Sequence, residues 1–163
     1  SVAGKLADFY KQDFFVLVTN DSISGKRMKD LLESRLPREK QDVIVLIVSS
    51  NDLFHLTNTK DFEAEADGVL KRFSPLSKKL LVVGPGNLGD TLALPIFMRY
   101  FYNLKSPSYQ KILTRVVGEY NTATHIKVGE VNSKKYGDIL AADKFHPNDQ
   151  GHTFWFDTIK PSL

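Results

Sequence analysis

The chain has 163 residues, of which 42% are hydrophobic and 25% are charged, so it has the composition of an ordinary globular protein and enough length for one sizeable core. Its 22 basic and 19 acidic residues leave a net charge of +3 and are mixed along the chain, which gives no indication of a nucleic-acid partner. The absence of cysteine excludes disulfides, thiol catalysis and cysteine-ligated zinc, and no apolar run is long enough to cross a bilayer.

Helical and strand-like patterns alternate along the chain. Apolar residues at helical spacing predict helices, and short runs rich in β-branched residues predict strands. Helices are expected at residues 2–9, 28–32, 62–73, 109–120 and 153–160, and strands at residues 14–18, 43–48, 80–83 and 125–128. Between the third strand and the fourth helix we expect an irregular segment that holds Pro95 and many aromatic residues.

This alternation predicts a single α/β domain over residues 1–163. Continuous apolar strands joined by helices form a parallel sheet covered on both faces, that is, a three-layer α/β/α sandwich of flavodoxin-like type. Such sheets bind ligands at the carboxyl ends of their strands. The polar loops at residues 20–25, 49–52 and 143–152 are all expected at that edge, which indicates an active site there.

The segment around His146 has the pattern of a catalytic base. Asp143 precedes His146 by three residues, and Pro147 follows the histidine directly, so the histidine is expected on a constrained loop just before a helix. A carboxylate at this spacing can bind one ring nitrogen and leave the other free to take a proton. An Asp–His pair of this kind activates a hydroxyl nucleophile.

Three motifs together resemble the SGNH/GDSL hydrolases. They are Asn20-Asp-Ser-Ile-Ser-Gly25, Ser49-Ser-Asn51-Asp52-Leu53 and Asp143-x-x-His146-Pro147, in the order in which the family has its second, third and last blocks. The resemblance implies a serine esterase or lipase-like hydrolase in which Gly25 and Asn51 form the oxyanion hole and Asp143 and His146 belong to the triad. Ser49 stands where the family usually has glycine.

The family's first block, Gly-Asp-Ser with the nucleophile, has no counterpart in the chain. The alternative that Ser1 is the nucleophile is disfavoured, because Ser1 precedes an amphipathic pattern as a helix N-cap does. A doubly wound domain also normally begins with a strand. We therefore expect the chain to be N-terminally truncated, without its central first strand and its nucleophile loop, and to be inactive alone.

Two other function classes stay open. A binding domain of the same fold that lost catalysis would also lack the first block. The run from Gly84 to Gly89 matches a dinucleotide fingerprint by letter, which would make the chain a nucleotide-dependent oxidoreductase, but no helix or ribose-binding acid stands at the required place after it. His146, His152 and Asp143 match no strong zinc spacing.

We expect no metal or cofactor, an acyl ester as the substrate, and no membrane span. Neither compartment nor oligomeric state can be read from the sequence.

Overall fold

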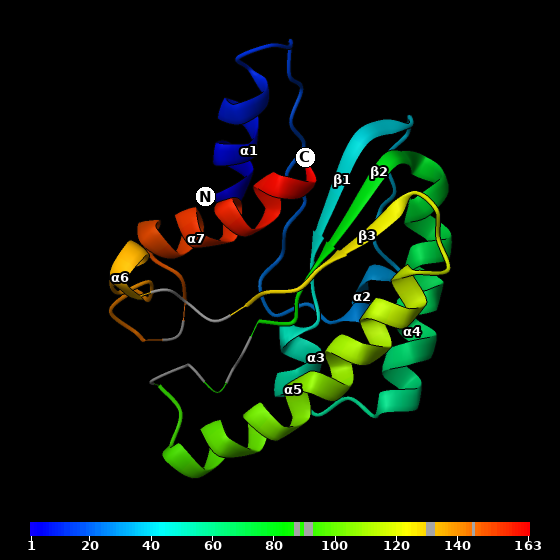
Figure 1. Ribbon diagram of the computed structural model, residues 1–163. Helices are drawn as coiled ribbons and strands as arrows, with labels where there is room; N and C mark the ends of the chain where they lie inside the picture. The colour runs from blue at the N-terminus through cyan, green and yellow to red at the C-terminus, as the bar shows by residue number, and fades with distance from the viewer. Residues whose placement is uncertain (87–88, 90–92, 130–132, 145) are drawn as a thin grey trace. The chain divides into compact units, whose positions relative to one another are not determined.

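The computed structural model has an α/β fold, and it describes residues 1–86, 89, 93–129, 133–144 and 146–163 (Figure 1). The strands are β1 (Gln41–Ile47), β2 (Ser77–Val83) and β3 (Ala123–Ile126). The helices are α1 (Val2–Tyr10), α2 (Met28–Leu31), α3 (Ser50–Phe54), α4 (Thr59–Phe73), α5 (Ile96–Val117), α6 (Ser133–Tyr136) and α7 (Asp149–Ile159), with short 3₁₀ turns at Ser74–Leu76 and Lys160–Ser162.

Two compact units make up the described chain. The terminal unit holds residues 1–24, 130–161 and 163, and the sheet unit holds residues 25–129 together with Ser162. The terminal unit contains α1, α6 and α7, whereas all three strands and helices α2 to α5 belong to the sheet unit.

The sheet of the sheet unit is parallel and has the order β1-β2-β3. The register aligns Val43 with Lys79 and Ile47 with Val83 in the first pair, and Leu80 with Ala123 in the second. Because every strand runs in the same direction, the loops that follow β1 and β2 leave the sheet at the same edge. The predicted strands at residues 43–48, 80–83 and 125–128 are confirmed, with bounds that differ by a few residues at most.

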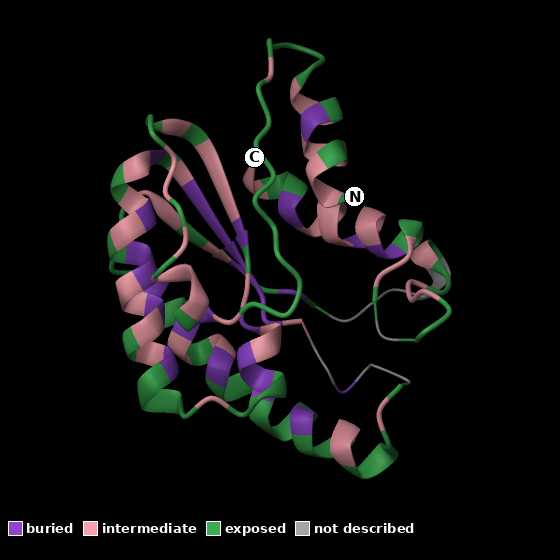
Figure 2. Ribbon diagram, turned by 180° about the vertical axis from the view of Figure 1, so that it is seen from behind, coloured by how far each residue is buried: buried purple, intermediate pink, exposed green. Residues whose placement is uncertain are grey.

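One face of the sheet packs against α4 and α5. Apolar residues of β1 and β2, apolar faces of the two helices and Leu53 of α3 form one continuous core. Leu53, Phe62, Ala66, Leu80 and Leu113 are among its most deeply buried members. Figure 2 shows the central strand as buried along most of its length. Leu81 and Val83, which point to the other face, are also buried, as expected for a parallel sheet.

The predicted strand at residues 14–18 is wrong. This segment has no regular structure, and Phe15 and Leu17 are 100% and 88% exposed. A strand needs a neighbour that pairs with its backbone groups. Among the described residues, the segment has no such neighbour, so its strong β-propensity is not realised.

Two helices differ from the sequence-based expectation. Helix α5 begins at Ile96, well before the expected start at Tyr109, so much of the segment expected to be irregular is helical and Pro107 lies inside the helix. Of the aromatic residues in its first half, Tyr102 is buried, whereas Phe97, Tyr100 and Phe101 are exposed. The segment at residues 49–52 was expected as a loop, but Ser50 to Asp52 belong to the short helix α3.

The terminal unit is built on α1 and α7. Ser1 caps α1 as expected, since its Oγ accepts the Gly4 N–H at 3.2 Å. Phe9 of α1 meets Phe156 of α7 with 6.1 Å between the ring centroids. None of the helices in the described part of the chain has the length and apolar character that a membrane crossing requires.

Candidate functional site

The loop after β1, residues 49–52, is called the Asn51 loop. Ser49 has φ 76, in the left-handed region that favours glycine, and its side chain is buried. No partner for the Ser49 hydroxyl is found among the residues that the structure describes. The turn that a glycine would make at this position is therefore formed by serine, with some backbone strain.

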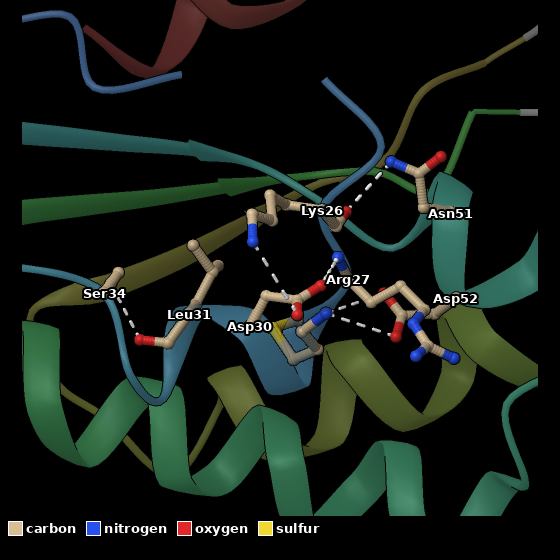
Figure 3. A network of polar contacts seen from close by, with 8 residues as sticks. Lys26, Arg27, Asp30, Leu31, Ser34, Asn51 and Asp52 are labelled. Atoms are coloured by element: carbon tan, nitrogen blue, oxygen red, sulfur yellow. Dashed lines mark hydrogen bonds and ion pairs between the residues drawn. The ribbon is translucent and has the colours of Figure 1, made fainter. Parts of the chain in front are cut away.

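Side chains of the Asn51 loop hold the segment that follows Gly25. The Asn51 Nδ2 donates to the Lys26 carbonyl oxygen at 2.9 Å, and the Met28 N–H donates to both Asp52 carboxylate oxygens at 3.1 and 3.2 Å (Figure 3). These bonds join residues 24 and 25 positions apart in the sequence. The Asn51 loop is thus tied to the segment directly after Gly25 at the carboxyl end of β1.

Asp52 is a buried carboxylate with a structural task. Its side chain is fully buried, and burial raises its pKa, although the hydrogen bond from Met28 acts in the opposite direction. No sequence pattern assigned Asp52 a part in positioning the segment after Gly25. The sequence shows an acidic residue directly after Asn51. Its partner Met28, however, lies 24 positions away, and no spacing pattern links residues that far apart.

The backbone N–H of Gly25 is available as a hydrogen-bond donor. It has φ +80, and an added Cβ would meet no atom within 4 Å, so its surroundings are open. Within the described residues, no acceptor lies in hydrogen-bond reach of this N–H. The Asn51 amide uses one of its two hydrogens on Lys26 and keeps a second one for another acceptor. The Gly25 N–H and the second Asn51 amide hydrogen are thus two donors without an acceptor among the described residues.

The glycine-rich loop after β2 has a packing reason for its first glycine. Gly84 has φ +121, and a Cβ there would stand 2.3 Å from the Val48 carbonyl oxygen. The Gly86 N–H donates to the Ser50 Oγ at 3.2 Å, which ties this loop to the Asn51 loop. Positions 87 and 88 of the dinucleotide-like run, and positions 90–92 beyond it, lie outside the described residues. The next long helix, α5, begins only at Ile96, too far on for a dinucleotide site.

The hydrogen bond expected between Asp143 and His146 is present in the terminal unit. The Asp143 Oδ2 lies 2.7 Å from the His146 Nδ1, and the Asp143 Oδ1 accepts the His146 backbone N–H at 3.0 Å. The carboxylate thus binds both the ring and the backbone of the histidine. Since Nδ1 carries the hydrogen of this bond, Nε2 is the nitrogen that can take a proton. Both side chains are solvent-exposed.

Asn148 positions the loop of residues 138–148, called the His146 loop. Its Nδ2 donates to the carbonyl oxygens of Asp138 and Leu140 at 2.8 and 2.9 Å, while its Oδ1 accepts the Gly151 N–H and caps α7. A Cβ on Gly151 would stand 2.3 Å from the Ile139 carbonyl oxygen, so the helix approaches the loop closely. Sequence reasoning missed Asn148, although an asparagine before a helix is an N-cap pattern.

The four predicted site residues thus fall into two groups. Gly25 and Asn51 belong to the sheet unit, where Asn51 binds Lys26, the residue after Gly25; Asp143 and His146 are hydrogen-bonded to each other within the terminal unit. That the four share one cleft stays a prediction. His152 lies in the first turn of α7. Over the described part of the chain, no group of three or more His, Asp or Glu side chains is arranged to hold a metal ion.

Comparison with known proteins adds a family and a fold. The model of the family "GDSL-like Lipase/Acylhydrolase" matches residues 1–159. A catalytic mutant of Axe2, an acetylxylan esterase from Geobacillus stearothermophilus, is 18% identical with a TM-score of 0.72, and the match covers 98% of this chain and 79% of that one.

Two further solved structures have the same fold. A protein described as a putative platelet activating factor from Streptococcus pneumonia is 15% identical with a TM-score of 0.74, covering 99% of this chain and 79% of that one. LAE5, an alpha/beta hydrolase from the metagenome of Lake Arreo, Spain, is 15% identical with a TM-score of 0.67, covering 99% and 80%. No curated protein matches the chain in sequence.

Proposed function

Because the chain belongs to the GDSL-like lipase/acylhydrolase family, we propose that it carries most of the catalytic groups of a serine esterase that cleaves carboxylic ester or thioester bonds. The hydrogen bond between Asp143 and His146 is the observation that carries this proposal. The solved structures with this fold include an acetylxylan esterase, which supports an ester as the substrate class.

The proposal assigns His146 the role of general base. Its Nε2 takes the proton of a serine hydroxyl while the serine oxygen bonds to the acyl carbon, and Asp143 holds the ring and stabilises the imidazolium. The imidazolium then gives its proton to the leaving alcohol or thiol as the acyl bond breaks. Water repeats the cycle on the acyl-enzyme and releases the acid.

Gly25 and Asn51 are assigned to the oxyanion. Negative charge develops on the acyl carbonyl oxygen when the serine attacks, and the Gly25 N–H and the remaining Asn51 N–H are the donors proposed to meet it. The bonds from Asn51 to Lys26 and from Met28 to Asp52 fix these donors before the reaction begins. Donors fixed in advance are the effective ones, each being worth about 3 kcal/mol in related sites.

The nucleophile is assigned to a serine outside residues 1–163. Ser1 Oγ is used as the N-cap of α1. In addition, among the described residues β1 lies at an edge of the sheet, so its backbone groups are available to pair with a further strand. A strand that ends in Gly-Asp-Ser, encoded upstream of Ser1, is the segment we expect.

Hydrolysis of 4-nitrophenyl acetate tests this proposal. We expect residues 1–163 alone to be inactive, and the protein expressed with its upstream coding sequence to hydrolyse the ester. Activity of residues 1–163 that is abolished by Ser1→Ala would instead make Ser1 the nucleophile. No activity in either form, with both forms folded, would favour a binding domain of the same fold.

A further inference from the structure

The first half of α5 presents an apolar surface that nothing in the described structure covers. Ile96, Phe97, Tyr100 and Leu104 are 81%, 71%, 67% and 60% exposed, and Phe101 is also exposed. At about 100° per residue, these five positions fall within about 140° of the helix circumference and form one stripe. Figure 2 shows this half of the helix mainly as exposed. The stripe of these five residues is called the apolar stripe.

The same face of α5 becomes cationic in its second half. Lys111 and Arg115 fall within the arc of the apolar stripe when the helical projection is continued. Together with Lys127, which directly follows β3, they line a hollow of about 360 Å³. Its other lining residues are Pro107, Gln110 and Thr114.

Basic residues predominate on this face. Helix α5 contains four basic residues and no acidic residue. Arg115 pairs with Glu63 of α4 at 2.6 Å, but in the part of the chain that the structure describes no carboxylate forms an ion pair with Lys111 or Lys127. The Lys105 ammonium lies over the Phe101 ring at 5.7 Å from its centroid, so a further cation borders the apolar stripe.

We propose that the outward face of α5 binds an anionic lipid surface, with the apolar stripe entering the interface and the hollow at Lys111 and Lys127 receiving acidic headgroups. A helix with aromatic and aliphatic residues beside lysine and arginine is the type that lies in a membrane interface. A second copy of the chain is a poorer occupant, because α5 itself contains no acidic residue and Glu63, the carboxylate that meets Arg115, is already paired. The proposal concerns binding and stands apart from the esterase assignment.

Flotation with lipid vesicles tests the proposal on residues 1–163. Vesicles of phosphatidylcholine alone are compared with vesicles that also contain about 30 mol % phosphatidylglycerol. We expect binding to the anionic vesicles, little binding to the neutral ones, and release as the salt concentration approaches about 1 M. Equal binding to both kinds of vesicle, or to neither, would overturn the proposal.

Variants locate the surface. Lys111→Gln and Lys127→Gln should each weaken partition to the anionic vesicles about fivefold, and Phe97→Ser about tenfold. The matched controls Lys60→Gln on α4 and Leu56→Ser remove an exposed cation and an exposed apolar side chain elsewhere on the sheet unit, and they should leave partition unchanged. All variants change exposed residues, so equal thermal melts by circular dichroism will show that folding is intact. Equal losses in the controls and the α5 variants would contradict the assignment.

Other occupants have their own signatures. Saturable binding of inorganic phosphate that Lys111→Gln removes, without vesicle binding, would reduce the hollow to a site for soluble anions. Binding of polyglutamate in place of vesicles would indicate an acidic protein partner. A dimer in analytical ultracentrifugation that Phe97→Ser dissociates would assign the apolar stripe to a second copy. Each of these results would overturn the lipid proposal.

Discussion

The Asn51 loop and the His146 loop are held in place by different kinds of contact. Hydrogen bonds of the Asn51 loop reach residues 24 to 36 positions away and include the buried carboxylate of Asp52. The hydrogen bonds that the structure describes for residues 138–144 and 146–148 of the His146 loop span at most 10 positions, and both Asp143 and His146 are exposed. The proposed oxyanion donors therefore depend on the fold of the sheet unit, whereas the described contacts of the Asp–His pair come from near neighbours in sequence.

This difference separates stability from function. A change in the Asn51 loop should affect both, because the same bonds join distant segments and aim the donors. A change of His146 should affect the reaction alone, because the exposed ring contributes little to packing.

The largest expected effects are on rate. In the active esterase, His146→Ala should lower kcat/KM for 4-nitrophenyl acetate by about 10⁴-fold or more, with little change in the free energy of unfolding. Asn51→Ala should lower it about 10²- to 10³-fold and also cost about 1 kcal/mol of stability through the lost bond to Lys26. Steady-state kinetics and urea unfolding measure both quantities. A loss of stability in His146→Ala together with none in Asn51→Ala would contradict the proposed difference between the His146 loop and the Asn51 loop.

Asp52→Ala should have the largest effect on stability, about 3 kcal/mol. The Met28 N–H is buried and would lose its acceptor, and a small cavity would remain. Asp52→Asn is the control. Since burial raises the pKa of Asp52, its charge is costly in the folded state, and an amide oxygen can still accept from Met28. Urea unfolding should show a clearly higher free energy of unfolding for Asp52→Asn than for Asp52→Ala. Equal losses of stability in the two variants would show that the charge of Asp52, and not its role as an acceptor, is what matters.

Ser49→Gly should stabilise the protein by about 1 kcal/mol. Glycine adopts the left-handed conformation without strain, and the substitution removes a buried hydroxyl for which the described residues offer no partner. Ser50→Gly, at the next position, should instead destabilise, because the Ser50 Oγ accepts the Gly86 N–H and the residue is helical. Thermal melts of the two variants should move in opposite directions. A lower melting temperature for Ser49→Gly would contradict the strain argument.

The smallest predicted effect is a pH dependence that arises at His125. Burial, with a smaller contribution from Lys127, lowers its pKa below 6.5, while its Nε2 bond to the Gly84 carbonyl acts in the opposite direction. The unfolded chain therefore binds the proton first, and stability is complete above about pH 6.5 and falls as the pH drops toward the folded-state pKa. Burial also lowers the pKa of His152, so this residue should change the stability with pH in the same direction.

Urea unfolding between pH 5 and 7 measures this dependence, which spans the ordinary histidine range. His125→Gln should flatten the slope of the unfolding free energy against pH. His55→Gln, which removes an exposed imidazole from the same unit, serves as the matched control. A slope that His125→Gln leaves unchanged would remove His125 as the origin of the pH dependence.

Local patterns predicted the features that depend on near neighbours. The Asp143–His146 bond follows from a spacing of three, and the strands at β1 and β2 follow from continuous apolar runs. The bond between Asp52 and Met28 could not be read in this way, because no pattern links positions 24 apart. The prediction of a strand at residues 14–18 is wrong for the same reason, because a strand forms only when a distant segment pairs with it.

Burial was the other property that the sequence could not settle. The aromatic residues in the first half of α5 have helical spacing, yet their exposure depends on the elements that pack against the helix. Residue type alone favours the core for phenylalanine and tyrosine. Their exposure is the feature from which the lipid-binding proposal starts.

The central claim is that His146 activates a serine that lies outside residues 1–163. The most direct measurement is mass-spectrometric mapping of a fluorophosphonate probe on the protein expressed with its upstream coding sequence. We predict a single adduct on a serine that precedes Ser1, lost in His146→Ala and retained in His152→Ala. An adduct on any serine within residues 1–163, or labelling that does not depend on His146, would contradict this claim.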